Sequence, residues 1–324
     1  MKRNYRWGIL GAGRIAEKFA AALNYTDGAE LYAVASREAV KAQAFAAKYN
    51  AAKQHSRYED LVTDPAVDIV YIATPHIFHC EQTLLCLRHH KAVLCEKPLA
   101  LNEREVTKMA GEARRQEVFL MEGMWSRFMP SINKARELID AGAIGSIQYL
   151  HADFGFKAPY DVQGRLYNRR LGGGSLLDVG IYPVFLSSFL LGEPAAIHTV
   201  AGKASTGVDE YCNVVFQYPG GQTAHIFSAI NVQTGLQAEI AGTEGRLLLQ
   251  RPWYKSEQLV LELSNGETSS FSFPLECNGF EYEIREVMEC LDKGFLECPA
   301  LPLDFSLQMS RTMDIIGQQA GVGY

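Results

Sequence analysis

The side chain best suited to chemistry is Lys97, which follows the apolar run Ala92–Cys95 in the segment Cys-Glu-Lys-Pro. Because Pro98 disfavours helical backbone at the residue before it, we expect Lys97 to end an extended strand. Burying an ammonium group without a partner is unfavourable, so a lysine in such a place is usually paired, shifted in pKa or used in chemistry. Lys97 is therefore our first candidate catalytic residue.

A second candidate pair lies in the segment Gly-Gly-Gly-Ser-Leu-Leu-Asp-Val-Gly-Ile-Tyr, residues 172–182. Asp178 and Tyr182 are four residues apart, so a helix would place them on one face. A tyrosine whose pKa is lowered by a nearby cation can act as a general base. Structural interpretations also stand: Ser175 and Asp178 have the spacing of a capping box, and Tyr182 could be a half-buried aromatic residue.

A glycine pattern near the start of the chain predicts a dinucleotide site. Tyr5–Leu10 is followed by Gly11-Ala12-Gly13-Arg14-Ile15-Ala16, where Gly11 permits a tight turn and Gly13 lets the backbone approach a pyrophosphate. A helix that begins at Arg14 and Ile15 would direct its N–H groups at the phosphates. An ordinary glycine turn between strand and helix is the alternative.

The second predicted strand ends in Ser36-Arg37 rather than in the acidic residue that usually binds the ribose 2′-hydroxyl of NAD. A hydroxyl and a guanidinium group suit a 2′-phosphate, and Arg37 can also stack on adenine. We therefore expect NADP as the cofactor, with NAD possible because Glu38 follows directly.

Further cofactor contacts are expected at Thr74, Pro75, His76, Glu96 and Lys97. These residues follow predicted parallel strands, and such sheets bind ligands at the carboxyl ends of their strands. His79 lies at the start of the next helix and joins them as a cofactor-binding candidate, although a histidine in such a place is more often structural.

The elements that position these residues alternate between strand and helix up to residue 123, which predicts a doubly wound parallel sheet. We expect strands at 5–10, 30–35, 69–73, 92–95 and 118–122, with helices at 15–24, 38–49, 79–89 and 103–116. After residue 125 a helix at 131–141 and a strand at 147–156 are followed by seven strand-like runs between 197 and 273, which predict a large, mainly antiparallel open sheet. Helices near 280–293 and 304–317 end the chain.

We therefore predict an NAD(P)-binding Rossmann domain at residues 1–124. An α+β domain at residues 125–324 would bind substrate and mediate oligomerisation, and its last helix could pack back on the first domain.

Composition argues against several other functions. The net charge of −6 is spread along the chain without a basic stripe, so we expect no nucleic-acid partner. Seven cysteines without a Cys-x-x-Cys pair predict neither a disulfide framework nor a metal site, and indicate a cytoplasmic setting. The longest apolar run, 176–191, contains Asp178 and Pro183 and is short of a membrane span, so we expect a soluble protein.

The glycine loop, Ala73-Thr74-Pro75 with His79, and the run Lys91–Leu99 together resemble the Gfo/Idh/MocA oxidoreductase family. The resemblance spans the whole chain. Within the family, the sequence most resembles the dihydrodiol dehydrogenase branch, whose relatives include sugar dehydrogenases. The stretches 119–130 and Thr206-Gly207-Val208-Asp209 strengthen it.

This resemblance implies reversible hydride transfer between a nicotinamide and a secondary hydroxyl of a cyclic diol or sugar. Lys97 would hold the reacting oxygen, and Tyr182 beside Asp178 would move its proton, although the reverse division between Lys97 and Tyr182 stays open. Trp125 and Phe154 would line the substrate site. The resemblance also implies a homodimer or homotetramer.

Two other functions stay open. A D-xylose or aldose dehydrogenase would use polar side chains near Asp153, Asn168 and Arg169, whereas Trp125, Phe154 and Trp253 favour an apolar ring. The other is a dinucleotide-binding regulator without turnover, because a fold does not by itself define a function.

Overall fold

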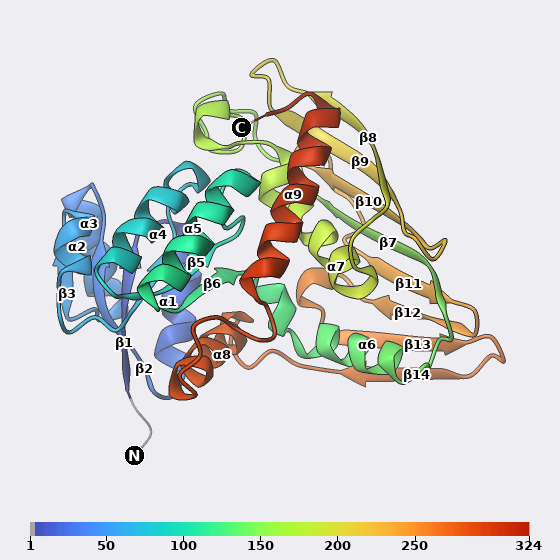
Figure 1. Ribbon diagram of the computed structural model, residues 1–324, viewed down its shortest axis with the longest axis horizontal. Coiled ribbons are helices and arrows are strands. Elements are labelled where there is room, and N and C mark those ends of the chain that lie inside the picture. Colours follow the sequence, from blue (N-terminus) through green and yellow to red (C-terminus); the bar gives the residue numbers. More distant parts are fainter. Residues whose placement is uncertain (1–3, 324) are drawn as a thin grey trace. The chain divides into compact units, whose positions relative to one another are not determined.

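The computed structural model describes residues 4–323 and divides into two compact units (Figure 1). The first contains the chain up to Trp125 together with Leu275–Leu307, and the second contains Ser126–Pro274 together with the residues from Gln308 onward. The long helix α9 (Leu303–Ala320) begins in the first unit and ends in the second.

The first unit is built on a six-stranded parallel sheet in the order β3-β2-β1-β4-β5-β6, which is the order of dinucleotide-binding sheets. Its strands are β1 (Tyr5–Leu10), β2 (Ala29–Ala35), β3 (Lys53–His55), β4 (Ile69–Ile72), β5 (Ala92–Glu96) and β6 (Leu120–Gly123). Its helices are α1 (Arg14–Tyr25), α2 (Ala39–Tyr49), α3 (Tyr58–Val62), α4 (His79–Arg88), α5 (Glu103–Gln116) and α8 (Phe280–Asp292).

The central strands of this sheet are covered on both faces, and every residue of β4 and β5 is buried. Helix α8 packs beside α1, and α4 packs beside α5 and against β4 and β5. The near-continuous apolar runs in the sequence reflect this double cover. The predicted parallel sheet is therefore confirmed, with β3 and α3 as additional short elements.

The second unit contains an eight-stranded sheet in the order β14-β13-β12-β11-β7-β10-β9-β8. Only the pairing of β7 with β10 is parallel, so the predicted mainly antiparallel sheet is confirmed. The strands are β7 (Ile147–Gly155), β8 (Ala196–Lys203), β9 (Asp209–Gln217), β10 (Thr223–Ala229), β11 (Ala238–Gly242), β12 (Gly245–Leu249), β13 (Gln258–Leu263) and β14 (Thr268–Ser272).

Helices α6 (Pro130–Asp140) and α7 (Ile181–Leu191) lie on one face of this sheet (Figure 1). The segment Arg169–Leu191 is long and apolar enough to cross a membrane, yet 89% of its apolar window is buried inside the protein. Such burial is typical of a core helix in a soluble protein, in agreement with the sequence-based expectation.

Candidate active site

The turn after β1 is shaped for a close backbone approach. Gly11 has a φ of +97°, and a Cβ there would come within 3.0 Å of the Ala73 carbonyl oxygen. At Gly13, which precedes the first turn of α1, no atom of the described residues lies within 4 Å of the place a Cβ would occupy. An open helix N-terminus behind two glycines fits the pyrophosphate of a dinucleotide.

The strand register brings the predicted site residues of the first unit to one sheet edge. Leu10 on β1 lies opposite Ile72 on β4, and Ile72 lies opposite Cys95 on β5. Gly11, Thr74 and Lys97 each come one or two residues after these paired positions. Residues 86 positions apart in the sequence therefore meet at the carboxyl edge, where doubly wound sheets bind ligands.

His79 holds two segments of this edge together. Its Nε2 lies 2.9 Å from the Thr74 carbonyl oxygen, and its Nδ1 lies 2.8 Å from the Pro98 carbonyl oxygen. The ring is fully buried, and this burial lowers the pKa of His79. His79 thus connects the backbone at Thr74 to the backbone at Pro98, next to Lys97. Direct contact of His79 with a cofactor stays a prediction.

Acidic side chains surround the end of β5. The Tyr71 hydroxyl donates to the Glu96 carboxylate, and Glu122 on β6 accepts from the Leu99 N–H at 3.0 Å. Burial raises the pKa of Glu122, while the Lys97 ammonium is among the groups that act in the opposite direction. Lys97 is partly buried, so its charge lies in a partly desolvated environment.

The tip of β2 carries the residues expected to select the cofactor. The guanidinium carbon of Arg37 lies 4.8 Å from the centre of the Phe78 ring, and Arg37 also contacts the Tyr58 hydroxyl. Ser36 is buried, and its Oγ accepts the Glu38 N–H at 3.3 Å. Arg37 is thus exposed and lies over the Phe78 ring, after the carboxyl end of β2 in the parallel sheet.

In the second unit, Asp178 lies on a π-helical turn (Leu176–Gly180) that leads into α7. Pro183 has no N–H to continue the α-helical ladder, and π-helical turns are frequent at functional sites. Asp209 supports the start of this turn, because its Oδ2 accepts the Leu176 N–H at 2.7 Å and the Ser175 hydroxyl at 2.6 Å. Burial raises the pKa of Asp209.

The capping-box interpretation of Ser175 and Asp178 is wrong. Ser175 donates to Asp209, and Asp178 instead accepts from Arg165 Nη1 at 2.8 Å. The turn is thus held by a long-range acceptor, Asp209, and Ser175 makes no side-chain cap of its own.

Tyr182 lies one helical turn after Asp178, among aromatic rings. Its ring centre is 5.3 Å from Phe154 and 5.5 Å from Tyr254, and these two rings stack on each other at 4.3 Å. This trio forms an apolar wall within the second unit. Tyr254 carries no motif of its own in the sequence, although it follows directly on Trp253.

Trp253 and Asp153, two other predicted substrate contacts, take part in the internal hydrogen bonding of the second unit. Trp253 is fully buried and donates through Nε1 to the Asp153 carbonyl oxygen at 2.8 Å. The Asp153 carboxylate accepts the backbone N–H groups of Leu236 and Gln237 at 2.8 and 3.1 Å. Both are thus engaged in the fold of the second unit. In the first unit, Trp125 stacks on Phe280 at 4.8 Å.

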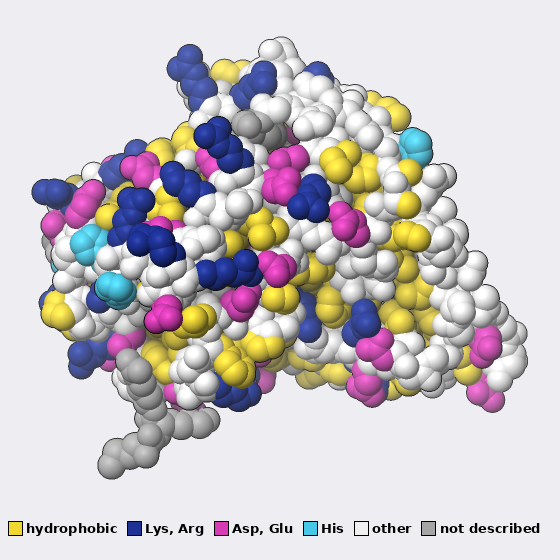
Figure 2. Space-filling model, in the orientation of Figure 1, with side chains coloured by type: hydrophobic (Ala, Val, Ile, Leu, Met, Phe, Trp, Pro, Cys, Tyr) yellow, Lys and Arg dark blue, Asp and Glu magenta, His cyan; other side chains and the backbone are white. Residues whose placement is uncertain are grey.

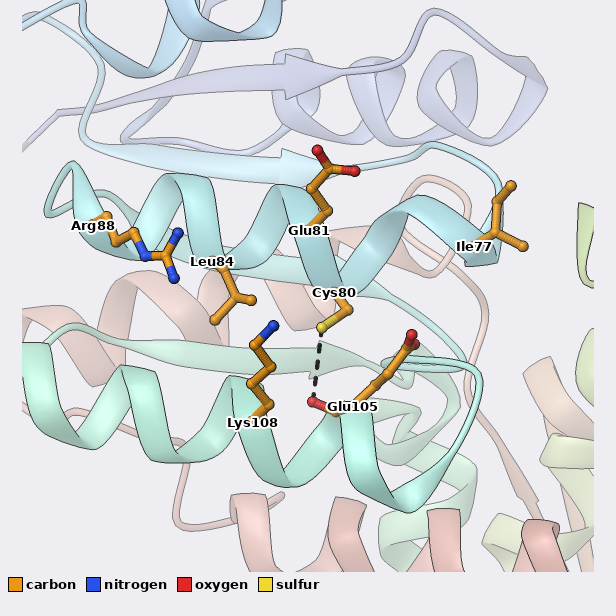
Figure 3. Close-up of a pocket in the computed structure, with 7 residues that line it drawn as sticks. All are labelled: Ile77, Cys80, Glu81, Leu84, Arg88, Glu105 and Lys108. Atoms are coloured by element: carbon orange, nitrogen blue, oxygen red, sulfur yellow. Dashed lines mark hydrogen bonds between the residues drawn. The ribbon is translucent and has the colours of Figure 1, made fainter. Parts of the chain in front are cut away.

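A surface pocket of about 370 Å³ opens between α4 and α5 (Figure 3). Its lining mixes Cys80 and Leu84 with the charged residues Glu81, Arg88 and Lys108, and it includes none of the predicted cofactor residues. Figure 2 shows side chains of both charges interspersed over these two helices. The pocket is therefore a feature of the helical layer, apart from the carboxyl edge of the sheet.

The glycine turn and strand order define a Rossmann-type dinucleotide-binding oxidoreductase. A family model described as "Oxidoreductase family, NAD-binding Rossmann fold" matches residues 5–124, and a "GFO/IDH/MocA C-terminal domain" model matches residues 132–248. The chain belongs to the Gfo/Idh/MocA family, as its motifs predicted, and is an NAD(P)-binding oxidoreductase that acts on CH–OH groups.

Similar proteins include the trans-1,2-dihydrobenzene-1,2-diol dehydrogenases of Mus musculus and Homo sapiens, which are 38% and 36% identical with 98% of each chain covered. Among solved structures, an aldose-aldose oxidoreductase from Caulobacter crescentus in complex with glycerol is 26% identical, with 98% of both chains covered and a TM-score of 0.89. A 3-ketoreductase from Actinomadura kijaniata in complex with NADP and TDP-benzene is also 26% identical, with 98% of both chains covered and a TM-score of 0.87.

Proposed function

We propose that this protein transfers a hydride between NADP and a secondary hydroxyl of a cyclic diol or sugar. The observation that carries the proposal is the shared register of Leu10, Ile72 and Cys95, which gathers Gly11, Thr74 and Lys97 at one sheet edge. Residues 1–124 form the dinucleotide-binding domain in this proposal, and residues 125–324 bind the substrate.

The cofactor is held mainly by backbone and by the strand tips. The N–H groups at Arg14 and Ile15 bind the pyrophosphate, and Ser36 and Arg37 bind the 2′-phosphate of the adenosine half. Thr74, Pro75, His76 and Glu96 line the edge along which the nicotinamide half extends. The nicotinamide supplies the hydride chemistry, because its ring accepts or releases the hydride.

Lys97 and Tyr182 act on the same substrate oxygen. Tyr182 takes the hydroxyl proton while the carbon that bears this hydroxyl gives its hydride to the nicotinamide. The Lys97 ammonium stabilises the negative charge that develops on the oxygen. Asp178, held by Arg165, orients the helix turn that carries Tyr182.

The substrate is a ring with an apolar face. The stacked Phe154 and Tyr254 beside Tyr182 support this choice, and Trp125 adds a further aromatic surface. The dihydrodiol dehydrogenases to which the chain is 38% and 36% identical act, by name, on a diol of this type.

A sugar dehydrogenase is the second candidate function, supported by the similarity to the aldose-aldose oxidoreductase. Against it, the Asp153 carboxylate is already engaged by two backbone N–H groups and is not available for sugar hydroxyls. A regulator without turnover is less well supported, because such a protein has no need to keep both Lys97 and Tyr182.

Homo-oligomerisation in the cytoplasm completes the proposal. Three side chains of β7, β8 and β9 are notably exposed: Tyr149 is 36%, Val200 67% and Val215 38% exposed. Covering such apolar groups on a second copy would stabilise a dimer or tetramer.

The test is a substrate screen with NADP⁺ and NAD⁺ over cyclic trans-diols, xylose and glucose, following reduced nicotinamide absorbance. The expected result is turnover of a trans-diol with a higher kcat/KM for NADP⁺. Preference for xylose would favour the sugar dehydrogenase, and a clear NAD⁺ preference would remove the assigned role of Arg37. NADP binding without turnover across the panel would favour the regulator.

A further inference from the structure

Three potential metal ligands converge at the end of α8, within the first unit and apart from the predicted site residues. Glu286 and Cys290 lie one turn apart on α8, and Cys298 lies in the segment that follows the helix. Glu286 Oε1 is 3.4 Å from Cys298 Sγ and 3.8 Å from Cys290 Sγ. All three ligand atoms lie within 4.8 Å of one another.

The two sulfur–oxygen separations are close to those between ligands of a tetrahedral zinc ion. Bond lengths of about 2.3 Å for Zn–S and about 2.0 Å for Zn–O place sulfur and oxygen ligands about 3.5 Å apart, and two sulfurs about 3.8 Å apart. The two observed sulfur–oxygen distances lie on either side of that value. Shifts of a few tenths of an ångström would therefore bring both sulfur–oxygen distances to the zinc value, and the two sulfurs already lie within 4.8 Å of each other.

The surroundings of the cluster also suit a thiolate-bound cation. Cys290 and Cys298 are 2% and 0% exposed, whereas Glu286 is partly exposed and offers a path for an ion and for a water as fourth ligand. A backbone N–H at Ala300 donates to Cys298 Sγ, as a second-shell partner of a metal thiolate does. Together the two thiolates and the carboxylate would carry three negative charges for a divalent cation to offset.

We propose that Glu286, Cys290 and Cys298 form a binding site for a thiophilic divalent cation of the Zn²⁺ class. Binding releases one proton from each thiol to solvent and leaves the fourth position to water. The ion would tie α8 to the segment 293–302 that leads into α9. The spacing Glu-x₃-Cys-x₇-Cys matches no common zinc motif, so the sequence alone predicts no metal here.

The carboxylate favours a metal over a disulfide. A bond between Cys290 and Cys298 would need no third group, yet Glu286 points its Oε1 at both sulfurs. The proposal is independent of the hydride-transfer function, because it rests on residues that have no role there.

The experiment is titration of the reduced full-length protein with Zn²⁺ alone by calorimetry, with bound zinc measured after dialysis. We expect one zinc per chain and a rise in Tm of at least about 3 °C at saturation. Cys298→Ser should weaken binding by at least about 100-fold and Glu286→Gln by at least about 10-fold. The matched controls Cys277→Ser and Glu289→Gln should bind zinc as the parent protein does.

Three results would overturn the proposal. One is the absence of stoichiometric binding by the reduced protein. Another is zinc binding that Glu286→Gln and Cys298→Ser leave unchanged. The third is a Cys290–Cys298 disulfide in protein purified without reductant, seen as the loss of two hydrogens in the mass of the joined peptides, with no zinc uptake after reduction. Glu286→Gln keeps the test valid if Cys298→Ser fails to fold, because Glu286 is partly exposed.

Discussion

Replacing Asp209 tests how the second unit positions its candidate catalytic residues. Asp209→Ala removes the acceptor of the Leu176 N–H and of the Ser175 hydroxyl. A buried donor without a partner costs about 1–3 kcal/mol. The Ser175 hydroxyl lies 3.0 Å from Ser228 Oγ and can turn to it, so the full cost falls mainly on the Leu176 N–H. We expect a loss of about 1–3 kcal/mol in the free energy of unfolding.

Asp209→Asn keeps one acceptor oxygen at this position, so we expect it to lose at most about 1 kcal/mol. It also removes an ionisable group. Burial raises the pKa of Asp209, so the folded protein holds this proton more tightly than the unfolded chain does. The stability that protonated Asp209 contributes is fully present below the carboxyl pKa of the unfolded chain. It is lost as the pH rises through the higher carboxyl pKa of the folded protein. Asp209→Asn should therefore gain stability relative to the parent protein as pH rises over that interval.

The assay is urea unfolding followed by circular dichroism, together with kcat and KM for the best substrate. Because Asp209 supports the turn that carries Asp178, the alanine variant should lose kcat more than NADP affinity. The matched control is Asp161→Ala, an exposed carboxylate that accepts only a local N–H from Gln163 at 2.9 Å, with an expected change within about 0.5 kcal/mol. Equal stability losses in Asp209→Ala and Asp161→Ala would refute the reasoning.

Three more predictions follow from the site. Arg37→Ala should reduce kcat/KM for NADP⁺ by about 10-fold or more and leave that for NAD⁺ nearly unchanged, because in the proposed function Arg37 makes one charged hydrogen bond to the 2′-phosphate; equal losses with both cofactors would contradict the assignment. Burial lowers the pKa of His79, so the unfolded chain binds a proton that the folded protein resists, and stability should fall as pH drops below about 6.5. His79→Gln should reduce this acid sensitivity in thermal melts from pH 8 to 5, whereas an unchanged slope would show that another group controls it. Phe154→Ala should raise KM for an apolar cyclic diol more than KM for xylose, since it removes the ring that stacks on Tyr254; an equal rise for both would argue against an apolar substrate surface.

The parallel sheet could be predicted from sequence because its signals are local. The apolar run before Gly11 predicted β1 to the residue, and the helical pattern at 103–116 predicted α5 equally well. The missed strand β3 has three residues, two of them exposed, so it carries no apolar run to detect. The short helix α3 was missed for a similar reason, because five residues are too few to establish a period.

The candidate site was harder to predict where contacts cross long stretches of sequence. The capping-box pattern at Ser175 failed because the Ser175 hydroxyl donates to Asp209, more than thirty residues later, and the same carboxylate accepts the Leu176 N–H. The partner of Asp178 is Arg165, and no local spacing links these two residues. Likewise, Phe280 stacks on Trp125 from a helix more than 150 residues away. Local motifs therefore predicted the candidate reactive groups, and only the fold revealed the groups that hold them.

The most direct test of the central claim is the hydride-transfer rate of Tyr182→Phe, measured by stopped-flow absorbance of reduced nicotinamide with the best substrate of the screen. The account predicts a loss of about 10²–10⁴-fold in kcat with little change in NADP affinity, because only the general-base contribution is removed. Lys97→Met should be at least as damaging. Full activity in Tyr182→Phe would contradict the account.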